Sequence, residues 1–132
     1  MSYVPAPVLL EIGVGMLEGG CKYGRHNYRI AGVRASIYYD AVMRHMMAWW
    51  EGEDTDPDSG LSHLTKAITS LIVARDAMIR EKLVDDRPPK TNSEWIAELN
   101  ARAKAVIEKY PDPVAPYTEV DLTWSEPPGS RS

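Results

Sequence analysis

Two histidines flank a dense acidic segment in the first half of the chain. They stand at positions 45 and 63, and between them five carboxylates fall within eight residues: Glu51, Glu53, Asp54, Asp56 and Asp58. Oxygen ligands suit hard divalent cations, whereas imidazole suits the borderline transition metals. Crowded carboxylates repel one another, so a site that holds them together commonly does so around a cation. The segment therefore predicts a divalent metal site, and solvated surface is the alternative interpretation.

A second segment carries the opposite charge. No acidic residue occurs between positions 19 and 39, and the basic side chains there are Lys22, Arg25, Arg29 and Arg34. The glycines near them leave backbone N–H groups accessible, and Arg or Lys beside such groups can bind phosphate. The Gly-x-x-x-x-Gly-Lys-Ser/Thr loop of nucleotide-binding proteins is absent. We expect an anion-binding loop, with ordinary surface charge as the alternative.

Hydrophobic periodicity predicts four helices that would position these two segments. We expect helices over residues 7–17, 33–50 and 59–83, with Gly19-Gly20 ending the first and either Asp56 or Ser59 capping the third. A fourth helix should follow the capping box Thr91–Glu94 and reach residue 110. Residues 19–31 would then form a loop, and residues 51–58 the turn between the second and third helices.

The predicted fold is an all-α four-helix bundle with an irregular proline-rich C-terminal tail. No run of alternating polar and apolar residues is long enough to require a sheet. A chain of 132 residues fits one domain, which we place at residues 1–124, with residues 125–132 as a disordered tail.

Composition excludes several classes of function. The net charge of −4 argues against binding a nucleic-acid polymer, which usually needs a basic surface. The single cysteine, Cys21, leaves no intramolecular disulfide and fits a reducing compartment. No apolar run is long enough for a signal peptide or a membrane span, so we expect a cytoplasmic protein without a membrane partner.

The polar residues recur in an order that resembles a known family. The pattern runs from Lys22-Tyr-Gly-Arg-His-Asn27 through Arg44-His45 to the segment Gly52–His63. It is similar to the phage-encoded dATP/dGTP diphosphohydrolases, which belong with the MazG-like all-α nucleoside triphosphate pyrophosphohydrolases. Within that family the resemblance is closest to the MazZ enzymes linked to 2-aminoadenine DNA synthesis. It covers residues 8–74 and departs at Tyr28 and Lys66, where the family usually has Trp and often His.

The resemblance implies an enzyme that cleaves a purine deoxynucleoside triphosphate to the monophosphate and pyrophosphate, in the cytoplasm of an infected cell. The expected substrate is dGTP, with dATP as the alternative, and Mg²⁺ or Mn²⁺ is the implied cofactor. The resemblance also implies a homodimer or homotetramer. We assign metal binding to Glu53, Asp56, Asp40 and Glu11, with His45 and His63 as further ligands or orienting groups. Catalytic roles go to Glu53, His45 and Lys22, and substrate contacts to Lys22, Tyr23, Arg25, Asn27, Tyr28, Arg44 and His63.

A rival interpretation is a non-catalytic helical protein of a phage whose surfaces bind a partner. In that case the acidic turn would be a contact surface, and His45 and His63 would be hydrogen-bonded core residues. Turnover of a nucleotide separates the two interpretations.

Overall fold

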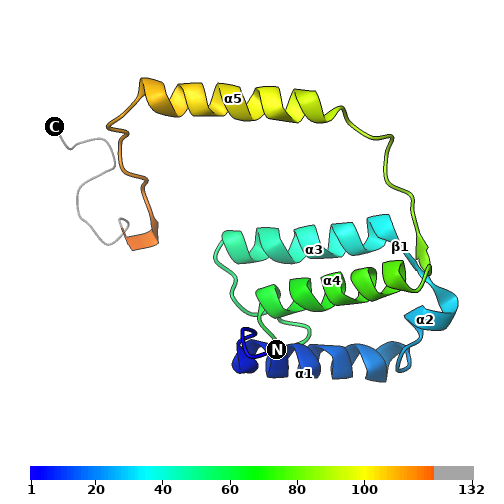
Figure 1. Ribbon diagram of the computed structural model, residues 1–132. Coiled ribbons are helices and arrows are strands. Elements are labelled where there is room, and N and C mark those ends of the chain that lie inside the picture. Colours follow the sequence, from blue (N-terminus) through cyan, green and yellow to red (C-terminus); the bar gives the residue numbers. More distant parts are fainter. Residues whose placement is uncertain (121–132) are drawn as a thin grey trace. The chain divides into compact units, whose positions relative to one another are not determined.

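The computed structural model describes residues 1–120 (Figure 1). In chain order the elements are α1 (Ala6–Tyr23), α2 (Tyr28–Ala31), β1 (Val33–Arg34), α3 (Ala35–Trp50), α4 (His63–Ile79), β2 (Leu83–Val84) and α5 (Ser93–Lys109). The strands are two residues long, so the predicted all-α class is confirmed. The chain divides into a first unit, residues 1–88, and a second unit that begins at Pro89. The predicted disordered tail, residues 125–132, lies outside the described part.

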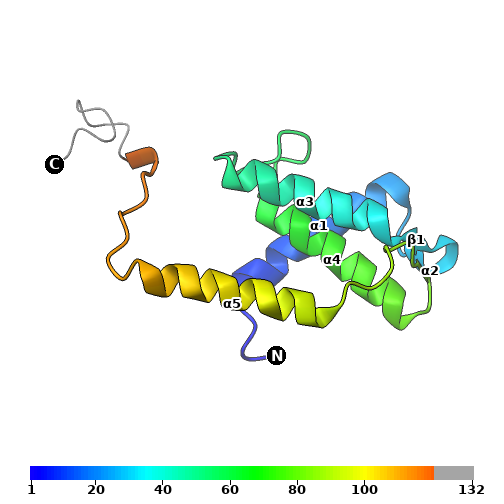
Figure 2. The same ribbon diagram turned by 90° about the horizontal axis from the view of Figure 1, so that it is seen from above.

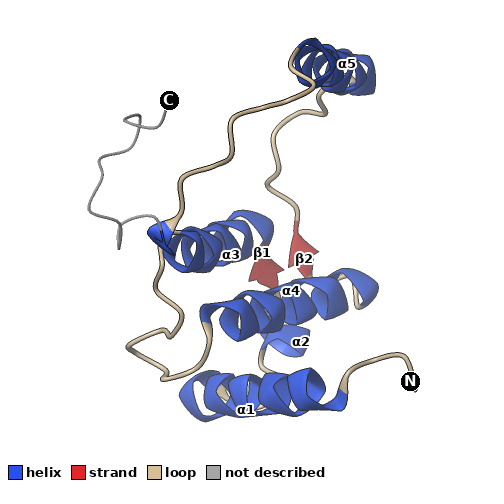
Figure 3. Cartoon of the chain, turned by 90° about the vertical axis from the view of Figure 1, so that its left-hand side faces the viewer, coloured by secondary structure: helices blue, strands red, loops and turns tan. Residues whose placement is uncertain are grey.

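Helix α4 is the centre of the first unit. It packs against α3 on one side and α1 on the other (Figures 1 and 3). Helices α3 and α4 run side by side in opposite directions, and α1 crosses them at an angle (Figure 2). Small residues allow this close packing, because Ala67 and Ala77 of α4 are 3% and 0% exposed. The two histidines are brought together because α3 ends and α4 begins at the same end of the unit.

The contact between α1 and α4 is largely polar. Gly15 is buried, and a Cβ atom on it would lie 2.6 Å from the methyl group of Thr69. The Thr65 hydroxyl donates to Glu11, and the Lys66 ammonium lies 2.6 Å from Glu18. The helices therefore meet where the glycine removes a side chain, with hydrogen bonds and an ion pair on either side.

A short parallel strand pair fastens the other end of the unit. Val33 of β1 pairs with Leu83 of β2, and the N–H of Val33 donates to the Lys82 carbonyl at 3.0 Å. The Asp86 carboxylate accepts from the N–H and the hydroxyl of Ser36 in the first turn of α3. A carboxylate at this position satisfies a free helix N–H and complements the helix dipole. Residues after α4 thus fix where α3 begins.

Several predicted boundaries were wrong. Helix α1 continues through Gly19-Gly20 to Tyr23 and ends at Gly24, whose φ of 90° breaks the helix. Helix α4 begins only at His63, because Ser62 caps it by accepting from the N–H of Leu64 at 3.2 Å. The parallel strand pair was not predicted at all.

The second unit contains α5 in its described part. Asn92 caps this helix by accepting from the N–H of Glu94 at 2.9 Å, in place of the predicted capping box. Glu98 and Arg102, one helical turn apart, form an ion pair. No helix between residues 1 and 120 has the length and hydropathy of a membrane span.

Candidate metal and phosphate site

The site is built on the loop between α3 and α4. Residues 51–62 fold back on themselves, with an isolated antiparallel bridge between Thr55 and Ser62. The N–H of Asp56 donates to the Leu61 carbonyl at 2.8 Å, and the Asp56 carbonyl accepts from Gly60 at the same distance. Gly60 has a φ of 72°, which suits a residue without a Cβ atom. These backbone bonds give Asp56 a fixed position at the end of the helix pair.

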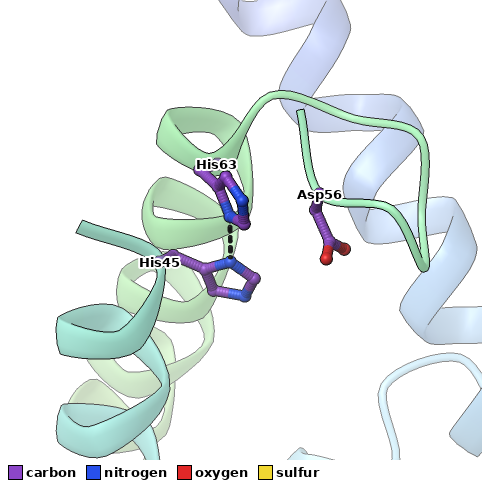
Figure 4. Close-up of side chains that lie close together, drawn as sticks. All are labelled: His45, Asp56 and His63. Carbon is purple, nitrogen blue, oxygen red and sulfur yellow. Dashed lines mark hydrogen bonds between the residues drawn. The ribbon is translucent and has the colours of Figure 1, made fainter. Parts of the chain in front are cut away.

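Three side chains converge there. His45 from α3, His63 from the start of α4 and Asp56 from the loop each offer one metal-binding atom, and these atoms lie within 4.8 Å of one another (Figure 4). The histidines are buried, with 8% and 4% of their surface exposed. Burial lowers the pKa of His45, with an opposing effect from the Asp56 charge. Neutral imidazole is the form that binds metal or accepts a proton.

The histidines form a chain of hydrogen bonds with Glu53. Nδ1 of His45 and Nδ1 of His63 are 2.8 Å apart, and Nε2 of His63 is 2.8 Å from Oε1 of Glu53. A carboxylate can only accept, so His63 donates to Glu53 from Nε2. A neutral His63 then accepts at Nδ1 from the Nδ1–H of His45. In this arrangement the Nε2 lone pair of His45 remains available.

Ser59 holds the carboxylate of Asp56. Its hydroxyl donates to Oδ2 at 2.6 Å and its N–H donates to the same oxygen at 3.1 Å. These bonds, the hydroxyl bond first, lower the pKa of Asp56, so the group is ionised at neutral pH. A carboxylate has about four lone-pair sites, so acceptor capacity remains for a ligand.

The donor set fits a divalent metal of borderline softness. Imidazole suits first-row transition metals and a carboxylate suits Mn²⁺ and Mg²⁺ alike, whereas Mg²⁺ prefers oxygen ligands alone. His45 and Asp56 could bind a cation as they stand. His63 could join them only if its hydrogen bond to His45 opened, since both of its ring nitrogens are already engaged. Glu53 then serves as the orienting carboxylate that metal-site histidines commonly have.

The structure places the remaining predicted metal residues outside this group. Glu53 touches His63, as described, and is not one of the three converging residues. Glu11 accepts a hydrogen bond from Thr65 at the α1–α4 contact. Asp40 is exposed on α3, five residues before His45. Of the four acidic residues predicted as metal ligands, Asp56 is the one in the converging group.

Lys22 links the basic segment to the acidic loop. Its ammonium group lies 2.7 Å from Glu18 and 3.2 Å from Asp58. These hydrogen bonds, the one to Glu18 first, raise the pKa of Lys22. Since Asp58 is largely exposed, the Lys22–Asp58 pair is solvated and can exchange its carboxylate for another anion. Two segments far apart in sequence and opposite in charge therefore meet within one protomer.

The other predicted substrate residues are divided between surface and core. Tyr23, Arg25 and Asn27 are exposed around the end of α1, and Arg44 is exposed next to His45. Tyr28 is only 7% exposed. Burial, followed by a hydrogen bond with Asp76, raises its pKa. Tyr28 therefore packs in the first unit, while the four exposed residues remain free to meet a ligand.

Sequence reasoning missed three ion pairs in the first unit. Glu18 joins Lys22 and Lys66, and Arg29 binds Asp76 through both oxygens, at 2.7 and 3.3 Å. The seven-residue spacing of Glu11 and Glu18 was a signal for one shared helix face. Nothing in the local sequence pairs Arg29 with a residue 47 positions later.

The fold and the site together define an all-α protein with a histidine–carboxylate group suited to a divalent cation. Comparison with protein families matches residues 1–87 to the family described as dATP/dGTP diphosphohydrolase, N-terminal. The chain belongs to this family. No curated protein and no solved structure gave a significant match. The family region ends where the first unit ends, so it contains α1 to α4 and the whole of the site.

Proposed function

We propose that this chain is a metal-dependent deoxynucleoside triphosphate pyrophosphohydrolase. It would cleave a purine substrate, dGTP before dATP, to the monophosphate and pyrophosphate. Its place would be the nucleotide metabolism of a phage with 2-aminoadenine DNA, in the cytoplasm of the infected cell, as in the MazZ enzymes. The observation that carries the proposal is the group formed by His45, Asp56 and His63 inside a chain of the dATP/dGTP diphosphohydrolase family.

The residues of the site would divide the work. Asp56 and His45 hold Mn²⁺ or Mg²⁺, and His63 with Glu53 fixes the orientation of the His45 ring. When bound, the cation supplies positive charge to the phosphate oxygens and polarises the reacting phosphorus. Lys22 exchanges Asp58 for a phosphate oxygen and stabilises the charge that develops on the leaving pyrophosphate. Arg25 and Arg44, both exposed, are further candidates for phosphate contacts.

A hollow at the C-terminal end of α3 offers a candidate position for the base. It has a volume of about 270 Å³ and is lined by Met46, Met47, Trp49, Trp50 and Glu51. Trp50 is 78% exposed. Indole and thioether groups can pack on a purine ring, and a carboxylate can accept hydrogen bonds from guanine N–H groups. Tyr23 and Asn27 at the end of α1 remain the alternative contacts to base and sugar.

Assembly of two or four copies is part of this proposal. The first unit leaves many apolar side chains exposed, among them Leu10, Leu17, Tyr39 and Met47. An exposed apolar surface of this extent is typical of proteins that associate.

The experiment is to incubate the full chain with each deoxynucleoside triphosphate, with and without Mn²⁺, and to identify the products. The account predicts metal-dependent release of pyrophosphate and monophosphate from dGTP, more slowly from dATP. Triphosphate or orthophosphate as the product would assign a different reaction. Absence of turnover with every nucleotide and metal would favour the non-catalytic interaction protein.

A further inference from the structure

Helix α5 has an apolar face that the other described residues of its unit leave exposed. None of its residues is buried, and the exposed large apolar residues are Trp95, Ile96, Leu99, Val106 and Ile107, followed by Tyr110 just after the helix. They recur at helical spacing and fall on one side, with Ala97 and Lys104 on the opposite side. In proteins an amphipathic helix such as α5 gains most of its stability by packing its apolar face against another surface.

The apolar face is symmetric about its own centre. Trp95 and Tyr110 lie at equal distances along the sequence from the midpoint between positions 102 and 103, and so do Leu99 and Val106. If a second α5 lay antiparallel on the first with these midpoints aligned, Trp95 would face Tyr110 and Leu99 would face Val106. Such a pairing is isologous, because each helix presents the same surface to the other.

The charges beside this face have a matching arrangement. Glu94 and Glu98 flank its N-terminal half, whereas Arg102 and Lys109 flank its C-terminal half on the same side. An antiparallel pair would bring the acidic half of each helix towards the basic half of the other. A parallel pair lacks this match, because the charged side of each helix would then meet the opposite side of its partner.

A hollow at the end of the helix matches the large residue of the predicted partner. It has a volume of about 550 Å³ and is lined by Val106, Ile107, Tyr110, Pro111 and Pro113, among others. Antiparallel alignment would place Trp95 of the second copy next to the hollow at the C-terminal end of α5. Within each helix Trp95 already has the Arg102 guanidinium 5.6 Å from its ring centre, and Arg102 is paired with Glu98. The indole is thus held in place before association.

We propose that α5 is a self-association surface, which pairs antiparallel with α5 of a second copy of this chain. Trp95 of each copy fills the hollow beside Tyr110 of the other, and Leu99 packs against Val106. This interface is separate from the catalytic proposal, because all of the candidate site lies before residue 89.

The first test changes the apolar face in the full chain. Leu99→Glu should reduce the mass measured by sedimentation equilibrium to half that of the unaltered protein. Ala97→Glu introduces the same charge on the opposite side of α5, and its mass should not change. A monomeric unaltered chain would overturn the proposal. So would a Leu99→Glu variant of undiminished mass, which is the result expected if α5 covered the first unit of its own chain.

The second test determines the direction of pairing by cross-linking and does not require the interface to be broken. In a Cys21→Ser background, Ala103→Cys lies near the two-fold axis and should form a disulfide-linked dimer on mild oxidation. Ile96→Cys lies at the end of the helix and should form little, because its counterpart is at the far end of the pair. Equal cross-linking at both positions would indicate parallel pairing, and no cross-linking at position 103 would exclude contact between the helix centres.

Discussion

At the scale of single residues, the site depends on which atoms are already bonded. Both ring nitrogens of His63 are engaged, by Glu53 and His45, and one oxygen of Asp56 is held by Ser59. The remaining donors are Nε2 of His45 and the free acceptor capacity of Asp56. Glu53 therefore acts through His63, as a residue that positions the imidazole next to a cation.

Replacing Glu53 by Gln should slow turnover by about 10- to 100-fold, the usual loss when an orienting partner of a metal-site histidine is changed. The melting temperature should change little, since the Glu53 side chain is 55% exposed. Steady-state rates of pyrophosphate release at saturating metal measure the effect. Glu51→Gln is a separate variant: it tests whether the Glu51 carboxylate at the hollow is responsible for a preference for dGTP over dATP. An unchanged rate for Glu53→Gln would remove Glu53 from the mechanism.

At the scale of elements, the α1–α4 contact depends on one glycine. A Cβ atom at Gly15 would lie 2.6 Å from the Thr69 methyl group, closer than side chains tolerate. Gly15→Ala should lower the free energy of unfolding by about 1–3 kcal/mol, the typical cost of overpacking. The additional change Thr69→Ser removes that methyl group and should restore most of the loss.

Gly13 is the matched control on the same helix, because a Cβ atom there would meet nothing within 4 Å. Gly13→Ala should leave stability unchanged or raise it by about 0.5–1 kcal/mol, the usual gain in an exposed helix interior. Urea denaturation of these three variants and of the unaltered protein measures the differences. Equal loss for Gly13→Ala and Gly15→Ala would contradict the predicted close contact.

The pair between Arg29 and Asp76 should make stability depend on pH. The hydrogen bonds from Arg29, and lesser effects, hold the pKa of Asp76 below its ordinary value of 3.8. The unfolded chain therefore binds the proton first as pH falls, so this stabilisation is present above about pH 4 and is lost below it. Arg29→Met should lower the urea midpoint at pH 7 and have a smaller effect at pH 3. Arg75→Met, also on the first unit, is the control, and an equal deficit for Arg29→Met at both pH values would contradict the account.

Local sequence patterns predicted the long helices but not all of their ends. The apolar periodicity of residues 33–50 and the polar segment after it define α3 and its loop well. Gly19 and Gly20 indicated a helix end, yet α1 continues because Glu18 binds Lys22 one turn later and Lys66 of α4. Tertiary contacts of this kind outweigh a propensity cost of about 1 kcal/mol for each glycine. The Ser62 cap was missed because Asp56 and Ser59 offered the same chemistry earlier in the chain.

The sequence predicted which segments form the candidate site, but not which carboxylate joins the histidines. Two histidines and an acidic turn between antiparallel helices must lie near one another, so His45 and His63 could be paired from sequence. Which carboxylate joins them depends on how the loop folds, and backbone bonds at Asp56 decide that. The same loop geometry places the Glu53 carboxylate where it accepts a hydrogen bond from His63, outside the converging group.

At the scale of the whole molecule, a phosphate group could bridge a cation held by His45 and Asp56 and the ammonium group of Lys22, which comes from a distant part of the sequence. The net charge of −4 disfavours a polyanionic substrate unless positive charge is supplied at the site. The free imidazole nitrogen of His45 predicts that Mn²⁺ binds more tightly than Mg²⁺, which prefers oxygen ligands alone.

Addition of Mn²⁺ should therefore stabilise the folded protein. At a metal concentration 100 times the dissociation constant the gain is about 2.7 kcal/mol, and differential scanning fluorimetry would record it as a higher melting temperature. Asp56→Asn should abolish most of the shift, and Mg²⁺ should give a smaller one. A shift retained in Asp56→Asn would place the cation elsewhere.

The most direct measurement is the rate of pyrophosphate release from dGTP by the full chain, by Asp56→Asn and by the matched control Asp54→Asn. Asp54 is an exposed acid of the same loop, and its carbonyl bond to His63 survives the change. We expect Asp56→Asn to lose turnover by at least two orders of magnitude, as expected for loss of a metal ligand, while Asp54→Asn stays close to the unaltered protein. Equal rates for the Asp56→Asn variant and the unaltered chain would contradict the central claim that the His45–Asp56–His63 group is where the chemistry occurs.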